Sequence, residues 1–456
     1  MMTRVWLMCA AAVLAASGLS ACGDEGKGDG GTFGAGGNGR VDGGAGGSAP
    51  QSRFVEEEIT GCPQGGTQAV MATSGTTVAV ASLAPREMTQ TCMTMNGPGQ
   101  VSVYDVCYAE STGGPFSAKV ATTQPYLAVT GVGLALSPSG QATLAYTGGP
   151  PAALRCGASD LVIVQGSGGN FGAERTIATG SMSGGLVAGM DAQCVQNVCN
   201  SGDATGFWPA AAYDASGGLL LAFRDLHFGF ANDDFASSDV ELARGNSILT
   251  VDVARGGGTY LHVASSPMGA VVAHYNGERD SSVNGIWVHR ETGAGAWEAQ
   301  RATPAKIGEM FGFSVSPAGK MAIAYYDAAM VRLRYVESGD GAAWTAPADI
   351  DTDGRIGQFP SLAYGPDGEP AIAYYRCGDY DPRSTSCDNN KDGLYLLRRR
   401  GGQWQRQKLR DEPGVFDGLY PAIGFAGGKA VVAFQVRSFD GSTMKSSVTW
   451  HALREQ

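Results

Sequence analysis

A two-strand phrase recurs along the chain and constrains its fold more than any other feature. Its clearest copy spans residues 359–376 and contains a short apolar strand, a Pro-Asp-Gly turn and a second apolar strand that ends in aromatic residues. Small and large side chains alternate within it, and the turn glycine reaches positive φ without strain. The phrase therefore predicts an antiparallel hairpin.

Six further copies place the same hairpin at intervals along the chain. Their turn glycines are Gly75, Gly140, Gly217, Gly269, Gly319 and Gly428. After most copies come a third apolar strand and an aromatic residue that opens a fourth strand, as at Trp297, Trp344 and Trp404. Four short strands repeated seven times predict an all-β chain folded as a seven-bladed β-propeller. Two stacked sandwiches would explain the strands but not the repeat, and a misread copy would make the count six or eight.

The two ends of the repeat region complement each other. The last unit ends with residues 448–453 and supplies only three strands, whereas residues 54–59 precede the first unit and have no partner of their own. We expect residues 54–59 to form the outer strand of the last blade. Such a closure removes an open sheet edge, and exposed edges invite aggregation.

Four insertions interrupt the repeat, at residues 84–100, 148–160, 180–206 and 377–393. Each follows the second or the fourth strand of its unit, so all four should lie on one face of the propeller. Long loops on one rim of a rigid scaffold commonly carry binding. We therefore expect ligand recognition on that face, with aromatic residues such as Trp208, Phe228 and Tyr380 beside acidic loops.

Eight cysteines remain when Cys9 and Cys22 near the N-terminus are set aside. They are Cys62, Cys92, Cys107, Cys156, Cys194, Cys199, Cys377 and Cys387. An even number of cysteines in an exported chain indicates disulfides. The sequence has no Cys-x-x-Cys motif, which argues against a zinc site. Cys194 with Cys199 is one expected local pair. Cys377 with Cys387 is the other, and the remaining four cysteines allow three pairings.

Residues 1–21 have the features of an export signal. A basic start is followed by an apolar stretch too short to span a membrane and by Leu19-Ser20-Ala21-Cys22, which resembles the lipobox of bacterial lipoproteins. The resemblance implies that Cys22 is lipidated and anchors the chain in a membrane. Gly23 follows in place of a retention aspartate, which favours the outer membrane or cell surface within the cell envelope.

The remaining chain divides into a tether and a folded body. Residues 22–52 are glycine-rich and predict a flexible linker, and the propeller should occupy residues 53–456. The formal charge of −11 argues against nucleic acid as a partner, because nucleic-acid binding needs clustered lysine and arginine.

Residues 338–344 resemble a degenerate Asp-box, the turn between the third and fourth strands of sialidase-like propellers. The body as a whole is similar to uncharacterised bacterial propellers of this kind. In that family the box is structural and does not itself imply hydrolysis. Catalysis there needs an arginine cluster, a tyrosine nucleophile with a glutamate, and an acidic aspartate.

The second strands end in polar residues that could line one pocket at the top of the central channel. The candidate binding residues are Arg224, Asp225, Tyr325, Asp327, Tyr374, Arg376 and Arg437. The arginine motif that sialidase-like enzymes carry ahead of the first blade is absent, and no Gly-x-Ser-x-Gly, His-Glu-x-x-His or phosphate loop is present. These residues therefore favour binding over catalysis.

Two acidic stretches, at residues 349–354 and 388–393, have the alternating oxygen ligands and final glycine of a calcium loop. The candidate ligands are Asp349, Asp351, Asp353, Asp388, Asn390 and Asp392. Position twelve is Pro360 in one stretch and Arg399 in the other, where calcium would need a glutamate. Solvated turns are the favoured interpretation, with calcium as the alternative.

Together these features predict an exported, lipid-anchored propeller that acts as a binding or scaffold module. Its ligand, a glycan or a protein, would engage the disulfide-braced loop face. The alternative is a carbohydrate-active hydrolase of sialidase-like shape.

Overall fold

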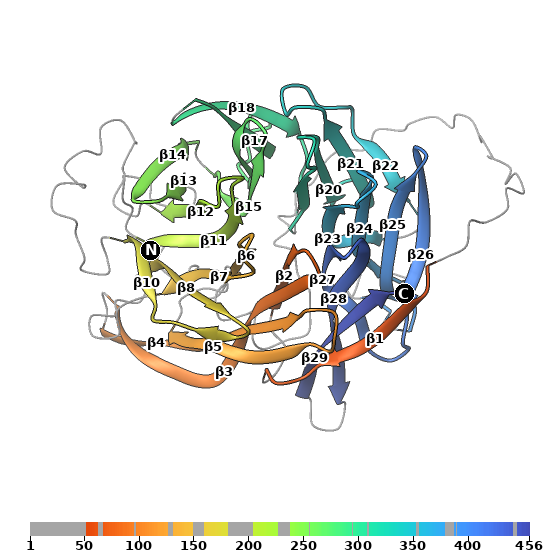
Figure 1. Ribbon diagram of the computed structural model, residues 1–456, viewed down its shortest axis with the longest axis horizontal. Helices are drawn as coiled ribbons and strands as arrows, with labels where there is room; N and C mark the ends of the chain where they lie inside the picture. Colours follow the sequence, from red (N-terminus) through yellow and green to blue (C-terminus); the bar gives the residue numbers. More distant parts are fainter. Residues whose placement is uncertain are drawn as a thin grey trace, which may run out of the picture.

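The computed structural model describes residues 52–62, 67–94, 97–125, 131–148, 159–180, 204–226, 238–254, 256–293, 295–307, 310–352, 355–378, 387–388, 390–440 and 445–456. Within these ranges every regular element is a β-strand, and no helix is long and apolar enough to cross a membrane. The strands form seven antiparallel sheets around a central axis (Figure 1). The predicted seven-bladed propeller is confirmed.

Each blade takes its strands in chain order from the axis outwards. Blade one holds β2 (Thr67–Ser74), β3 (Thr77–Thr94), β4 (Gly97–Ser111) and β5 (Ser117–Pro125). Blade two holds β6 (Gly133–Leu136), β7 (Ala142–Gly148), β8 (Asp160–Ser167), β9 (Asn170–Phe171) and β10 (Arg175–Thr179). Blade three holds β11 (Ala204–Tyr213), β12 (Leu219–Leu226), β13 (Ser238–Arg244) and β14 (Ser247–Asp252).

The second half of the ring repeats this order. Blade four holds β15 (Thr259–Ser266), β16 (Gly269–Asn276), β17 (Gly285–Gly293) and β18 (Ala296–Thr303). Blade five holds β19 (Gly312–Val315), β20 (Met321–Asp327), β21 (Arg332–Ser338) and β22 (Ala348–Asp351). Blade six holds β23 (Arg355–Tyr364), β24 (Pro370–Cys377), β25 (Gly393–Arg400) and β26 (Gln403–Arg410). Blade seven holds β27 (Phe416–Ala426), β28 (Lys429–Asp440) and β29 (Lys445–Glu455) from the C-terminal part of the chain.

The N-terminal strand β1 (Phe54–Ile59) completes blade seven. It pairs antiparallel with β29 over its whole length, from Phe54 opposite Glu455 to Ile59 opposite Trp450. Figure 1 shows β1 at the rim beside β29, so the two ends of the chain share one sheet. The predicted closure is therefore present.

The seven turn glycines predicted from the repeat all have positive φ, from 59° at Gly75 to 135° at Gly269. Several of them, including Gly140 and Gly368, have no atom within 4 Å of the place where a Cβ would sit. Backbone conformation rather than crowding therefore selects glycine at these two turns.

The hydrophobic core lies between the blades. One apolar cluster joins blades three and four through Leu242 and Val272, and another joins blades seven and one through Trp450 and Val80. The innermost strands contact one another in sequence around the ring, with β27 returning to β2. Each sheet is therefore buried on both faces, which explains why its second strands are almost wholly apolar.

The first insertion has a structure of its own. Residues 84–100 were expected as a loop, but they extend β3 and β4 into a long hairpin that pairs as far as Thr94 opposite Gly97. The inserted residues continue the β-ladder because it satisfies their backbone hydrogen bonds. Residues 149–158, 181–203 and 379–386 of the other three insertions lie outside the described residues.

Two disulfides are formed within the described residues. Cys377 pairs with Cys387, as predicted, with their Cα atoms 5.2 Å apart. Cys62 pairs with Cys107 at a Cα separation of 5.9 Å, which selects among the pairings that the sequence left open. The predicted Cys194–Cys199 pair, Cys156 and the side chain of Cys92 lie outside the described part.

Candidate functional site

The loop-bearing face of the propeller is the end where second strands lead to third strands and fourth strands lead to the next blade. The inner strands of five blades carry a β-bulge close to this face, one of them between Thr67 and Val70 in β2 and the others in four later blades. The register shifts lie between Phe207 and Ala210 in β11, Thr259 and His262 in β15, Gln358 and Ser361 in β23, and Leu419 and Ala422 in β27. A bulge adds one residue to a strand and redirects a side chain, and bulges are common beside binding sites.

Each of the four bulges in β11, β15, β23 and β27 holds an aromatic residue in the left-handed backbone region. The four residues and their φ values are Trp208 (47°), Tyr260 (54°), Phe359 (52°) and Tyr420 (47°). A bulky side chain rarely adopts this conformation, which costs about 1–3 kcal/mol at each position. Proline follows three of the four, although a residue before proline normally stays extended. The surrounding fold therefore holds four strained aromatics at equivalent places.

These aromatic residues contact each other across blade boundaries. The Trp208 and Tyr260 rings meet edge to face with centroids 6.2 Å apart, and those of Phe359 and Tyr420 lie 4.3 Å apart. Phe359 is buried, whereas the other three are half-buried. Trp208, Tyr260 and Tyr420 therefore keep part of their surface exposed near the loop-bearing face.

Arg224, a predicted binding residue, lies beside Trp208. Its guanidinium carbon is 5.3 Å from the centre of the Trp208 ring, and its Nη1 donates to Thr259 Oγ1 at 3.4 Å. The side chain is only 2% exposed. This cation–π contact fixes the orientation of the Trp208 ring. Arg224 itself is buried too deeply to bind a large ligand directly.

Behind Arg224 is a group of buried carboxylates in blade three. The predicted residue Asp225 lies opposite Asp239, and Glu241 follows two residues later on the same face. Burial and then the Asp225 and Asp239 carboxylates raise the pKa of Glu241 well above its usual value. Glu241 accepts a hydrogen bond from Thr250 Oγ1 at 3.0 Å.

The other predicted binding residues lie in blades five, six and seven. Tyr325 is fully buried and bonded to Thr303, and Asp327 accepts from Arg334 at 3.1 Å. Tyr374 donates to Asp351, and the guanidinium of Arg376 lies 5.6 Å from the centre of the Tyr395 ring. Arg437 lies opposite Phe416 in blade seven. Arg224 lies against Trp208 of blade three, and Arg376 lies against Tyr395 of blade six.

In the acidic stretches proposed for calcium, the described carboxylates pair with other groups of the same chain. Asp349 pairs with Arg334 at 2.9 Å, and Asp351 pairs with Arg406 at 3.0 Å. Asp388 accepts from the backbone N–H of Asn390, as in an ordinary turn. Asp353 lies outside the described residues. These contacts give the calcium alternative no support.

Asp392, another candidate calcium ligand, accepts a 2.6 Å hydrogen bond from the Tyr375 hydroxyl. Both side chains are buried, and Tyr375 packs beside Cys377. Burial raises the pKa of Asp392 to about 7, against the opposing effect of the Tyr375 hydrogen bond. Tyr375 and Asp392 therefore form a buried hydrogen-bonded pair.

We expect this raised pKa to make stability depend on pH. The folded protein keeps the Asp392 proton up to about pH 7, whereas the unfolded chain loses it near the ordinary value of 3.8. The contribution is therefore complete below pH 4 and is lost as pH rises through 7, by about 4 kcal/mol at most. Asp392→Asn should remove this loss, so its melting temperature should rise relative to wild type between pH 4 and pH 8.

The control for this experiment is Asp280→Asn in blade four. Asp280 is exposed, and the Ser282 backbone N–H lowers its pKa. Its melting curves should therefore run parallel to those of wild type between pH 4 and pH 8. Parallel curves for wild type and Asp392→Asn would contradict the assignment.

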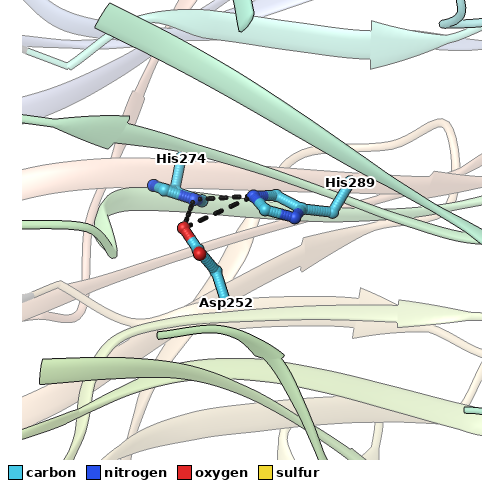
Figure 2. Close-up of side chains that lie close together, drawn as sticks. All are labelled: Asp252, His274 and His289. Atoms are coloured by element: carbon cyan, nitrogen blue, oxygen red, sulfur yellow. Dashed lines mark hydrogen bonds and ion pairs between the residues drawn. The ribbon is translucent and has the colours of Figure 1, made fainter. Parts of the chain in front are cut away.

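A cluster that the sequence analysis missed lies between blades three and four. Asp252 ends β14, while His274 in β16 and His289 in β17 face it from the neighbouring sheet (Figure 2). The Nε2 atom of His274 is 3.1 Å from Asp252 Oδ2 and 3.0 Å from His289 Nε2. Separations of 22 and 15 residues form no recognisable motif, and the cross-strand register alone unites these residues.

Comparison with known proteins assigns the chain to no family. No protein-family description matches the chain, and no curated protein is similar to it in sequence. The fold is similar to a protein of unknown function from Dyadobacter fermentans, with 13% identity, a TM-score of 0.44, and coverage of 71% of this chain and 94% of that one.

Two further structural neighbours are proteins of different kinds, a sialidase and a domain of a protease. The NanB sialidase of Streptococcus pneumoniae has 10% identity and a TM-score of 0.46 over 90% of this chain and 71% of its own. The β-propeller domain of the Trilobed protease from Pyrococcus furiosus has 10% identity and a TM-score of 0.41 over 84% and 96%. Likeness at this level concerns the propeller fold alone, so the chemistry of this chain must be argued from its own residues.

Proposed function

We propose that this protein is a binding module that recognises a glycan through aromatic residues at the loop-bearing end of its central channel. The supporting observation is the set of left-handed aromatics Trp208, Tyr260, Phe359 and Tyr420, which recur at equivalent bulges. Strain that a fold maintains at four related positions favours a functional role over a packing accident. Sugar rings have apolar C–H faces that stack on such aromatics.

The same proposal includes export and attachment. The lipobox-like Leu19-Ser20-Ala21-Cys22 and the glycine-rich residues 22–52 would place the propeller on a tether at the cell envelope. Disulfides such as Cys62–Cys107 are typical of an oxidising compartment and support this location. The membrane would then be a partner through the lipid only, and the loop-bearing face would remain free for a ligand.

A hydrolase is the less supported alternative. Tyr375 and Asp392 form a tyrosine–carboxyl pair, but both side chains are at most 3% exposed. The arginines that would bind a substrate carboxylate contact aromatic rings in different blades. A general acid or nucleophile must reach its substrate, and this pair does not.

A glycan-array screen followed by titration of the best ligand tests the proposal. Trp208→Ala should weaken binding by about 2 kcal/mol, roughly thirtyfold, because aromatic anchors dominate such sites. Tyr213→Ala is the matched control, since Tyr213 lies at the opposite end of the same strand β11. It should leave the affinity unchanged.

Trp208→Gly separates the strain from the ring. Glycine adopts positive φ freely, so this variant should be more stable than Trp208→Ala by about 1 kcal/mol while binding equally poorly. Binding that survives the loss of Trp208, Tyr260 and Tyr420 in turn would contradict the proposed site. Release of sugar from an array ligand would favour the hydrolase instead.

A further inference from the structure

We infer that Asp252, His274 and His289 form a binding site for a transition-metal ion, Zn²⁺ or a similar borderline divalent cation, between blades three and four. Their three ligand atoms converge on one point from two different sheets (Figure 2). Two imidazole nitrogens and one carboxylate oxygen are the donor set that such ions prefer. This inference is independent of the proposed glycan site.

The separations of the three atoms match one face of a tetrahedron. His274 Nε2 is 3.0 Å from His289 Nε2 and 3.1 Å from Asp252 Oδ2, and His289 Nε2 is 3.6 Å from Asp252 Oδ2. Ligand atoms around a tetrahedral ion with bonds of about 2.0–2.2 Å lie about 3.3–3.6 Å apart. An ion can therefore bind with shifts of a few tenths of an ångström and keep one position open.

Protons alone do not satisfy these atoms. The Gly258 N–H donates to His274 Nδ1 at 3.1 Å, so Nδ1 accepts and Nε2 carries the proton of that ring. This one proton faces both Asp252 Oδ2 at 3.1 Å and His289 Nε2 at 3.0 Å. It cannot be donated fully to both atoms, whereas a cation at this point would contact all three.

The burial of the ligands indicates how an ion would reach the site. The Asp252 side chain is 17% exposed, whereas both histidines are almost fully buried, so an ion would enter from the Asp252 side.

Ligation through His274 Nε2 requires its proton to move to Nδ1, which a ligating histidine normally uses to donate to a carbonyl. The Gly258 N–H occupies that position in this structure. Rotation of the Gly257–Gly258 peptide would present a carbonyl to Nδ1, and it would break both the Gly258 hydrogen bond and the 3.1 Å bond from Ser238 Oγ to the Gly257 carbonyl. We expect loading to break these two bonds.

Calorimetric titration of the EDTA-treated protein with Zn²⁺, and separately with Ni²⁺, tests the site. Wild type should bind one ion per chain, and the melting temperature should rise with metal concentration. Asp252→Asn and His289→Gln should each weaken binding at least tenfold. Asp252→Asn preserves the size of the side chain, so it keeps the test valid if the buried histidine variant does not fold.

His451→Gln is the control, because His451 is a partly buried histidine of blade seven outside the cluster. It should bind the ion as wild type does. Equal affinity and stoichiometry in wild type, Asp252→Asn and His289→Gln would place the ion elsewhere and overturn the inference, as would the absence of binding by wild type. Neither result would affect the glycan test, which uses different residues and a different ligand.

Discussion

Removal of residues 53–59 is expected to open the propeller at its seam and to lower the apparent melting temperature of the whole molecule. These residues include β1, which pairs with β29 along its full length and buries Ile59 against Trp450. The loss would expose the entire outer edge of β29. An unpaired edge of this length invites association with another chain, so oligomers should appear as well.

Single substitutions in β1 show how much of the stability that this strand contributes comes from side-chain packing and how much from strand pairing. Ile59 is 5% exposed and belongs to the cluster between blades seven and one, so Ile59→Ala should cost about 2–5 kcal/mol. Val55 on the same strand is 45% exposed, and Val55→Ala should change stability by about 0.5 kcal/mol or less. Glu57 contributes a partly exposed ion pair with Arg454 at 3.0 Å, which is worth less than the packing.

A peptide covering residues 52–60 provides the sharpest test of this closure. It should restore the melting temperature and the monomeric state of the truncated protein, because it can pair again with β29, whereas a scrambled peptide should not. Differential scanning calorimetry and light scattering would measure both effects. An unchanged melting temperature and a monomeric truncated protein would show that blade seven is stable with three strands.

The architecture could be predicted because its determinants are local and repeated. The hairpin phrase specifies a turn glycine, and every predicted copy, from Gly75 to Gly428, has the positive φ that the turn requires. The unpartnered segment at residues 54–59 and the three-strand last unit likewise left one sensible closure. Repetition turns a weak local signal into a strong one, since seven copies must all be compatible with the same fold.

The bulges could not be predicted in the same way. Trp208 and Tyr420 precede prolines, a context that normally predicts extended backbone, yet both are left-handed. Tertiary packing around the channel overrides the local preference there. The aromatic–proline pairs at these two positions and at Phe359 were visible in the sequence, and they are the signal that could have identified this part of the site.

The cluster of Asp252, His274 and His289 could not be predicted from the sequence, because its residues are brought together by strand register and by packing between blades. His274 and His289 lie diagonally across neighbouring strands, with His274 opposite Trp287 and His289 opposite Val272. Asp252 arrives from another blade. A prediction would have needed the register within blade four and the rotation of blade three against it, both of which arise from packing between sheets.

Removal of the Cys62–Cys107 disulfide is expected to weaken the same seam by a different route. Cys62 follows β1 of blade seven, and Cys107 lies in β4 of blade one, so the bond ties the closing strand to the next blade. The residues are 45 apart in the chain, and chain entropy alone gives the bond a contribution of about 4 kcal/mol. Cys62→Ala with Cys107→Ala should lower the stability by up to that amount.

The second disulfide serves as the control because it closes a loop within one blade. Cys377 and Cys387 are 10 apart, and the same relation gives about 3 kcal/mol for their bond. The two disulfide variants should therefore differ mainly in which backbone amides become less protected, as measured by hydrogen–deuterium exchange. Loss of Cys62–Cys107 should expose the amides of β1 and β29, whereas loss of Cys377–Cys387 should leave them protected. Equal protection of the β1 amides in both variants would mean that strand pairing alone keeps β1 on β29. The Cys62–Cys107 disulfide would then stabilise the protein without protecting the closure of blade seven.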